Sequence, residues 1–179
     1  MSFVIRPSEQ ASVAVDGSEE RFPVRRIYCV GRNYRAHAIE MGADPDRDPP
    51  FFFMKPADAI VENGSTIPYP RQTENLHHEI ELVAALGRGG SNIDEQSALD
   101  HVWGYGVGID LTRRDIQNRA REMGRPWDMG KGFDNSAPCS PLRPASEVGH
   151  PDTTKAAIWI KVNGATKQES TLDLHIWTT

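Results

Sequence analysis

The sequence predicts a mixed α/β fold that consists mostly of strands, with short helices in the connections. Strand-like apolar runs recur along the whole chain, and the segments of helical character between them are short. The pair Asn163-Gly164 separates two alternating stretches and is the strongest two-residue signal for a β-hairpin. Because long helices do not alternate with the strands, a doubly wound parallel sheet is disfavoured.

The first half of the chain contains two strand signals. The run Arg26 to Val30 is compact and β-prone, and Gly31 closes it with a turn. We expect Asn33 to cap a short helix that runs to about Met41. After a charged, proline-rich loop, the aromatic run 51–54 predicts a buried strand.

The second half continues the same pattern and completes one domain. We assign residues 1–24 to a leader or small hairpin and residues 25–179 to one catalytic domain. The expected elements are a long strand 76–86, a short helix 94–102, a strand 103–111, a helix capped by Thr112 that ends near Gly124, and a hairpin 156–168.

Composition excludes several classes of function. The net charge is −5, so no basic face for nucleic acid or an anionic membrane is expected. No apolar stretch is long enough to span a bilayer, and Arg6 and Pro7 interrupt the start of the chain before a signal peptide develops. With only Cys29 and Cys139, a disulfide framework is excluded, and we expect a cytoplasmic protein.

Three carboxylates are the candidate ligands of a divalent metal. Glu79 and Glu81 stand two residues apart on a predicted strand, so they share one face and repel each other. Asp110 ends a second apolar strand. Three carboxylates without a thiolate favour Mg²⁺ or Mn²⁺ over zinc. The alternative is a solvent-exposed pair of glutamates without a function.

Five further residues are candidates for catalysis or for binding an anion, but the sequence evidence for each one alone is weaker. His37 and Glu40 lie three residues apart on the short helix and could pair as a general base for water. Lys131, between two glycines, could reach an anionic oxygen, and Arg114 and Gln117 share a helix face. Each of these has the alternative of an ordinary solvated surface.

The glycines at 104, 106 and 108 do not form a dinucleotide-binding motif. That motif needs its glycines in the turn between a strand and a helix, with a different spacing. Here they lie inside the apolar run, where they permit a bend or a close approach of backbones.

Several segments together resemble the fumarylacetoacetate hydrolase superfamily, and within it the acylpyruvase and fumarylpyruvate hydrolase branch. They occur in family order, and they are Val30-Gly-Arg-Asn-Tyr34 with His37 and Glu40, Phe52-Phe-Met-Lys-Pro56, Asn75-Leu-His-His-Glu-Ile-Glu-Leu82, Gly108-Ile-Asp-Leu-Thr-Arg-Arg-Asp115 with Gln117, and Pro126-Trp127 through Lys131-Gly-Phe133.

The resemblance implies a role for each candidate. It implies a β-sandwich roll with short helices, a homodimer, and a mobile helix that carries the water-activating pair. The implied residues are Glu79, Glu81 and Asp110 as Mg²⁺ or Mn²⁺ ligands, His37, Glu40 and Lys131 as catalytic groups, and Arg32, Arg114 and Gln117 as substrate-binding groups.

The implied reaction is metal-dependent hydrolysis of a C–C bond in a small 2-oxo acid, a 3-acylpyruvate, with fumarylpyruvate favoured in aromatic compound catabolism. Members of this branch continue past the length of this chain, so we expect a C-terminally incomplete roll or an altered tail. The alternatives are oxaloacetate decarboxylation, isomerisation or hydration of a dienoic 2-oxo acid, and an inactive homologue that acts through dimerisation.

Overall fold

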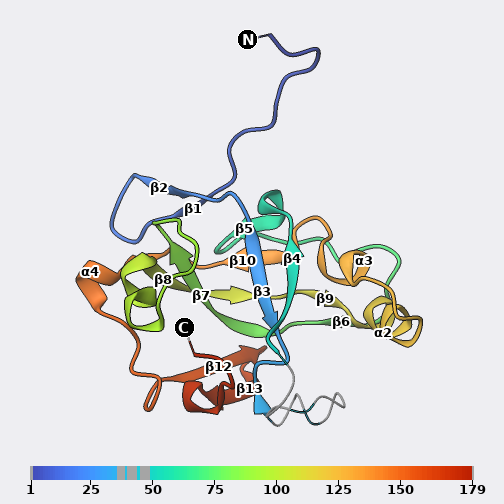
Figure 1. Cartoon of the computed structure of the whole chain (residues 1–179). Coiled ribbons are helices and arrows are strands. Elements are labelled where there is room, and N and C mark those ends of the chain that lie inside the picture. Colours follow the sequence, from blue (N-terminus) through green and yellow to red (C-terminus); the bar gives the residue numbers. More distant parts are fainter. Residues whose placement is uncertain (1, 36–38, 40–43, 45–48, 179) are drawn as a thin grey trace.

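The computed structural model describes residues 2–35, 39, 44 and 49–178, and strands predominate in it over short helices (Figure 1). This confirms the predicted mixed, mostly β class. The strands are β1 Ser12–Ala14, β2 Arg21–Pro23, β3 Ile27–Gly31, β4 Phe51–Lys55, β5 Ile60–Glu62, β6 Leu76–His77, β7 Ile80–Leu86, β8 Val102–Ile109, β9 Thr112–Arg113, β10 Ala137–Cys139, β11 Arg143–Pro144, β12 Ala157–Val162 and β13 Ala165–Thr171.

The helices of the described residues are short. They are the 3₁₀ helices η1 Ala57–Ala59, η2 Glu95–His101 and η3 Leu172–Leu174, and the α-helices α2 Arg114–Glu122, α3 Asp128–Lys131 and α4 Ala145–Val148. In the part of the chain that the structure describes, no helix has the length and apolar character that crossing a membrane requires.

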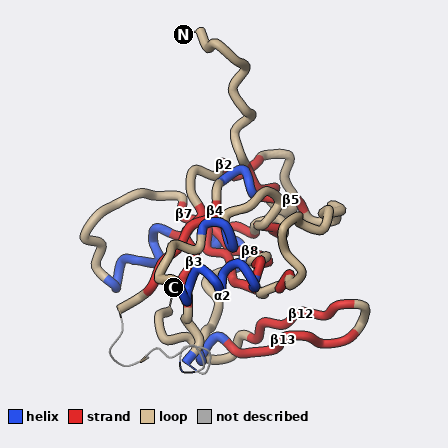
Figure 2. The backbone as a smooth tube through the Cα atoms, turned by 90° about the vertical axis from the view of Figure 1, so that its right-hand side faces the viewer, coloured by secondary structure: helices blue, strands red, loops and turns tan. Residues whose placement is uncertain are grey.

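Strand β8 is the centre of the largest sheet. It pairs antiparallel with β7 along one edge and with β10 and β11 along the other, and β10 continues in parallel to β5. The β3–β4 pair crosses in front of this sheet in Figure 1, and the β12–β13 hairpin extends along one side of the molecule in Figure 2. The site described below lies where β7, β8, β4 and α3 meet.

The main apolar core lies under the β1–β2 pair. Val13, Val24, Ala85 and Leu142 are buried together there. Partly buried side chains surround them: Ala11, Phe22, Ile27, Ala57, Ile60, Val83, Trp103 and Cys139. Residues 1–24, expected as a leader or small hairpin, thus contribute β1 and β2, which cover one end of the large sheet.

The predicted close approach of backbones at the glycine run is confirmed at Gly104. This residue pairs with Pro144 of β11, and a Cβ atom at Gly104 would collide with the carbonyl of Arg143. The predicted hairpin is also confirmed. Asn163 and Gly164 both have positive φ, 52° and 81°, as the tight turn between β12 and β13 requires.

The strand predicted over residues 76–86 is interrupted, so this prediction was wrong in part. β6 pairs with β9 and β7 with β8 in one continuous register, and Glu79 lies in the short gap between β6 and β7, opposite the gap between β8 and β9. The helix expected to start at Asn33 lies mostly outside the described residues. The short helix expected over residues 94–102 forms as the 3₁₀ helix η2, a geometry common in short connections.

Thr112 does not cap the helix, in contrast to the prediction. It belongs to β9 and is fully buried, and Arg113 occupies the capping position of α2 without a side-chain capping bond. The Thr112 hydroxyl donates instead to the Asp110 carbonyl oxygen, 3.1 Å away, and accepts from Lys131. It is therefore part of the site.

Candidate active site

Pairing of β7 with β8 brings the three predicted carboxylates to one region. The Asp110 N–H donates to the Glu79 carbonyl oxygen at 2.8 Å, and Ile80 lies opposite Ile109 in the ladder. The side chains of Glu79 and Asp110 both reach the Lys131 ammonium. Glu81 follows on β7, and its carboxyl group is close enough to feel the charges of the other two carboxylates.

Lys131 is the hub of this region. Its side chain is 2% exposed, and its Nζ donates to Glu79 Oε2 at 2.7 Å, Asp110 Oδ2 at 2.5 Å and Thr112 Oγ1 at 2.7 Å. The sequence suggested a lysine in a flexible loop, but it ends helix α3 and is buried. A buried ammonium with three acceptors is fully hydrogen-bonded and holds two carboxylates in place.

Lys55 is a site residue to which the sequence analysis assigned no role. It ends β4, its side chain is 2% exposed, and its Nζ lies 2.9 Å from Asp110 Oδ1. The ammonium also donates to the carbonyl oxygens of Leu111 and Lys131, at 3.0 and 2.5 Å. The available signal was a single lysine directly after the aromatic run 51–54, since a buried lysine needs a partner.

Burial and charge shift the pKa values of the carboxyl groups in different directions. Burial raises the pKa of Glu81 to about 8, and the nearby charges of Asp110 and Glu79 add to the rise. Burial also raises the pKa of Asp110, against the opposing effects of Lys131 and Lys55. At Glu79 burial acts in the same direction, but Lys131 and Arg114 outweigh it and hold the pKa below its usual value.

The donor chemistry of this region fits a hard divalent cation. The Glu81 side chain is partly exposed to solvent, but surrounding protein atoms and the charges of Asp110 and Glu79 oppose its ionised form, a conflict that a cation resolves. In the described residues, no three acidic, imidazole or thiol groups already converge as ligands, and Lys131 stands between Glu79 and Asp110. The residue types therefore suit a divalent cation, although these side chains are not arranged as a complete set of metal ligands.

Two of the predicted substrate-binding residues lie at the edge of this cluster. Arg114 forms an ion pair with Glu79, and its Nη1 donates to Gln117 Oε1 at 2.8 Å, which confirms that the two share a helix face. Gln117 is itself buried. The two side chains thus place a cation and an amide beside Glu79.

Arg32 lies against aromatic side chains instead. Its guanidinium carbon is 5.6 Å from the centre of the Phe51 ring and 5.8 Å from that of Trp127. The Phe53 ring, which contacts both of these rings, lies 4.8 Å from Lys131 Nζ. An aromatic wall therefore connects Arg32 with the carboxylate cluster. The other two candidates, His37 and Glu40, lie outside the described residues.

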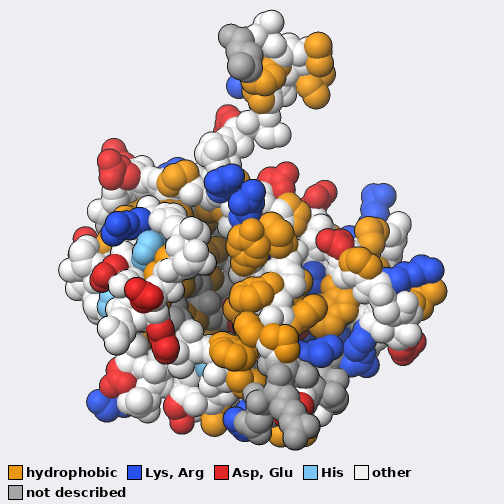
Figure 3. Space-filling model, viewed as in Figure 1, with side chains coloured by type: hydrophobic (Ala, Val, Ile, Leu, Met, Phe, Trp, Pro, Cys, Tyr) orange, Lys and Arg blue, Asp and Glu red, His pale blue; other side chains and the backbone are white. Residues whose placement is uncertain are grey.

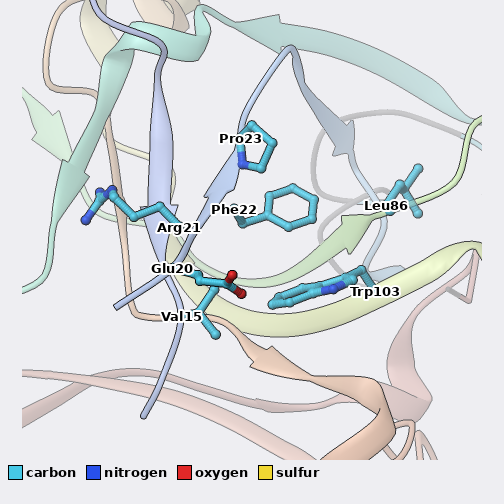
Figure 4. Close-up of a pocket in the computed structure, with 8 residues that line it drawn as sticks. Val15, Glu20, Arg21, Phe22, Pro23, Leu86 and Trp103 are labelled. Carbon is cyan, nitrogen blue, oxygen red and sulfur yellow. The ribbon is translucent and has the colours of Figure 1, made fainter. Parts of the chain in front are cut away.

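A separate pocket of about 370 Å³ lies between the β1–β2 pair and the ends of β7 and β8 (Figure 4). The Phe22 and Trp103 rings face each other in it, with centroids 5.1 Å apart. Its charged side chains, Glu20 and Arg21, are exposed. Because it contains no buried charged group, we assign the active site to the carboxylate cluster and not to this pocket.

The raised pKa of Glu81 predicts how stability depends on pH in metal-free protein. An unfolded glutamate titrates near its ordinary value, whereas folded Glu81 keeps its proton up to about pH 8. Folding then retains a proton, so the stabilisation present at low pH is lost as pH rises from about 4.5 to 8. Because solvent reaches the Glu81 side chain and weakens the effect, we expect Glu81→Gln to remove a slope that is clearly smaller than the limit of about 1.4 kcal/mol per pH unit for one proton.

The measurement is urea unfolding in EDTA between pH 5 and 8.5. The informative quantity is the difference in unfolding free energy between the two proteins, because it cancels the groups that titrate in both. A difference that stays constant with pH would contradict the protonated state of folded Glu81 at neutral pH.

The comparisons with known proteins identify the family. The family model described as "Fumarylacetoacetate (FAA) hydrolase C-terminal" matches residues 26–179. The chain therefore belongs to the fumarylacetoacetate hydrolase family.

Within the family, this chain is most informatively compared with three proteins. It is 58% identical to the fumarylpyruvate hydrolase of Pseudomonas aeruginosa, solved in complex with Mn²⁺ and pyruvate, with a TM-score of 0.91 over 98% of this chain and 76% of that chain. It is 43% identical over 127 residues to a fumarylpyruvate hydrolase of a Ralstonia species, covering 71% of this chain and 65% of that protein. It is 40% identical over 144 residues to the mitochondrial oxaloacetate tautomerase FAHD1 of Arabidopsis thaliana, covering 80% of this chain and 63% of that protein.

The chain thus spans a little less than two thirds of the length of these curated relatives. The structural likeness confirms the family fold that the resemblance implied.

Proposed function

We propose that this protein hydrolyses the C–C bond of 3-acylpyruvates, with fumarylpyruvate as the favoured substrate. The observation that carries the proposal is the cluster of Glu79, Glu81 and Asp110 around the buried Lys131. The similarity to a fumarylpyruvate hydrolase that was solved with Mn²⁺ and pyruvate supports the same reading. Such a reaction would belong to the catabolism of aromatic compounds.

In this proposal, Glu79, Glu81 and Asp110 hold one Mg²⁺ or Mn²⁺ ion. The ion, when bound, supplies Lewis-acid polarisation of oxygens at the 2-oxo acid end of the substrate. Lys55, Lys131 and Arg114 already balance Asp110 and Glu79, whereas the ionised form of Glu81 is opposed by both carboxylates, and a bound cation would offset that repulsion. The Lys131 ammonium keeps Glu79 and Asp110 oriented and offers a positive charge to anionic oxygens.

The remaining candidates act on the substrate and on water. His37, oriented by Glu40, takes a proton from a water molecule, whose oxygen adds to the acyl carbonyl. The bond to the pyruvyl methylene carbon then breaks, and that carbon takes up a proton, so fumarylpyruvate and water give fumarate and pyruvate. Arg114 and Gln117 beside Glu79, and Arg32 along the aromatic wall, bind the carboxylates and oxygens of the substrate.

The test is a substrate assay with purified protein. With Mn²⁺ or Mg²⁺ we expect loss of fumarylpyruvate absorbance and equal amounts of pyruvate and fumarate, and EDTA should abolish both. His37→Ala should remove turnover and leave Mn²⁺ binding unchanged. No metal-dependent loss of fumarylpyruvate would overturn the proposal.

A second candidate reaction is keto–enol interconversion of oxaloacetate. The 40% identity to the Arabidopsis oxaloacetate tautomerase favours it. It uses a 2-oxo acid and the same carboxylates but breaks no C–C bond. Interconversion of oxaloacetate without fumarylpyruvate cleavage would support this candidate, and CO₂ release would support the decarboxylase alternative.

We also propose that the protein is a cytoplasmic homodimer. Tyr28, Val30, Phe52 and Met54 form cross-strand pairs on one face of β3–β4, and their exposed fractions are 60, 41, 55 and 43%. Apolar side chains cover this face of the molecule in Figure 3. An exposed apolar patch of this kind is typical of an interface between subunits. The two free cysteines suit a reducing compartment.

The homodimer leads to a prediction for Phe52→Asp. A buried, unpaired carboxylate disfavours association strongly, so we expect the variant to be monomeric at micromolar concentration, where the wild type is dimeric. Light scattering after size-exclusion chromatography measures the mass. A monomeric wild type, or a dimeric variant, would contradict this interface.

A further inference from the structure

The β12–β13 hairpin reaches the carboxylate cluster through one face of β13. Gln168, Ser170 and Leu172 alternate along the chain, so they point to the same side, toward the body of the molecule. Gln168 and Ser170 are half-buried and Leu172 is 3% exposed, whereas Lys167, Glu169 and Thr171 are exposed. The inner face of β13 therefore carries two polar side chains into the protein.

Gln168 contacts the peptide bond directly after Glu79. Its Oε1 accepts a hydrogen bond from the Ile80 N–H at 3.0 Å, across 88 positions of sequence. The carbonyl oxygen of the same peptide unit, that of Glu79, accepts from the Asp110 N–H at 2.8 Å. The 79–80 peptide is thus held from both sides, by the backbone of Asp110 and by the side chain of Gln168.

This arrangement satisfies the edge of β7 that carries no neighbouring strand in the described residues. Backbone groups alternate in direction along a strand, and Glu79 directs its carbonyl to Asp110, so the N–H of Ile80 lies on the side of β7 that faces away from β8. A half-buried N–H without an acceptor costs free energy and leaves its peptide able to rotate. Gln168 supplies the acceptor that a continuous strand neighbour would otherwise give.

A second set of contacts from the same part of the chain reaches Tyr34, near Glu81. The Ser170 hydroxyl hydrogen-bonds the Tyr34 side chain, and the Tyr34 ring packs edge-on to His175 with centroids 4.5 Å apart. Asn33 exchanges hydrogen bonds with Trp177, at 2.8 and 2.9 Å, and its carbonyl oxygen accepts from the Ile176 N–H at 2.7 Å. Residues 168–177 therefore fasten both the Asn33-Tyr34 segment and the carboxylate strand.

We propose that Gln168 is a positioning residue, which fixes the 79–80 peptide so that the Glu79 and Glu81 carboxylates face Asp110. The inference rests on the proposed metal site. It adds that the affinity for the metal is set in part by a residue of β13, which touches neither metal nor substrate. Groups that orient ligands in this way commonly change metal affinity by about 10- to 100-fold.

The test compares Gln168→Met with the control Glu169→Met in the full chain. Methionine keeps the length of Gln168 but has no strong acceptor, and Glu169 is the adjacent residue on the outer face of the same strand. We expect Gln168→Met to weaken Mn²⁺ binding at least about tenfold and to speed amide exchange at Ile80 at least about tenfold in metal-free protein. Glu169→Met should leave both within about twofold of the wild type.

Gln168→Glu retains an acceptor oxygen, so it should restore slow exchange at Ile80. Mn²⁺ affinity of Gln168→Met within twofold of the wild type would overturn the inference even if the unfolding midpoint falls, because the role would then be structural only. A wild type that binds no Mn²⁺ would instead overturn the proposed metal site, and with it this inference. The two failures are therefore distinguishable.

Discussion

Replacing Lys131 with methionine is expected to lower the unfolding free energy of the metal-free protein by about 3–5 kcal/mol. The ammonium is almost fully buried and bonds Glu79, Asp110 and Thr112 at once. Without it, two buried carboxylates lose their shared counter-charge, and methionine returns only the apolar contacts. Removing one partner of a buried ion pair is costly for this reason.

Urea unfolding in EDTA measures this effect, and the same experiment with Mn²⁺ should recover part of the lost stability. A divalent cation bound by the carboxylates would neutralise the charge that Lys131 no longer balances. The exposed Lys167 on β13 gives a matched control, since Lys167→Met should change stability by no more than about 0.5 kcal/mol. A similar small change in Lys131→Met would refute the hub role of this lysine.

Asp110→Asn and Glu81→Gln should have the same effect on metal binding and opposite effects on stability. Each removes one proposed ligand charge, so Mn²⁺ affinity should fall by about 100-fold or more and turnover should be lost. Asp110 lies between the ammonium groups of Lys55 and Lys131, and its loss leaves the buried Lys55 without a carboxylate and Lys131 with that of Glu79 alone. We therefore expect Asp110→Asn to destabilise the metal-free protein by about 3–5 kcal/mol.

Glu81→Gln should instead make the metal-free protein more stable than the wild type at pH 7, because the glutamate is ionised in the unfolded wild type but protonated in the folded one, and the two proteins should be equally stable near pH 4.5. The wild-type carboxyl is held in its protonated form by burial and by the charges of Asp110 and Glu79, so the neutral amide replaces a neutral acid. Mn²⁺ titration and urea unfolding of both variants measure the two properties separately. A destabilised Glu81→Gln, or a fully stable Asp110→Asn, would show that the charges of the cluster are distributed differently.

The sequence predicted the fold class well where a local pattern determines the structure. Asn163-Gly164 forms the tight turn of β12–β13, because these residue types accept the positive φ that such a turn needs. The aromatic run at 51–54 forms β4, but the prediction that it is buried was wrong, since Phe51, Phe52 and Met54 are exposed and Phe53 is half-buried. The gap at Glu79 could not be read from the sequence, because it lies opposite the gap between β8 and β9, and only the pairing of the two segments shows this.

The candidate site, like the fold, could be predicted from the sequence only in part. Three carboxylates were predictable from their placement in apolar strands, and the structure brings Glu79 and Asp110 to one ammonium. Lys55 and Thr112 were missed, because a lysine after an apolar run and a threonine before a helix have common local explanations. Only the tertiary contacts reveal that both side chains turn inward to Asp110.

The most direct test of the central claim is a titration of metal-free protein with Mn²⁺, followed by the signal of the free ion. We expect one bound ion per chain in the wild type, and none in a variant that combines Glu79→Gln, Glu81→Gln and Asp110→Asn, with folding of that variant verified by circular dichroism. Absence of binding to the folded wild type, or undiminished binding to the folded triple variant, would contradict the assignment of these three carboxylates as the metal site.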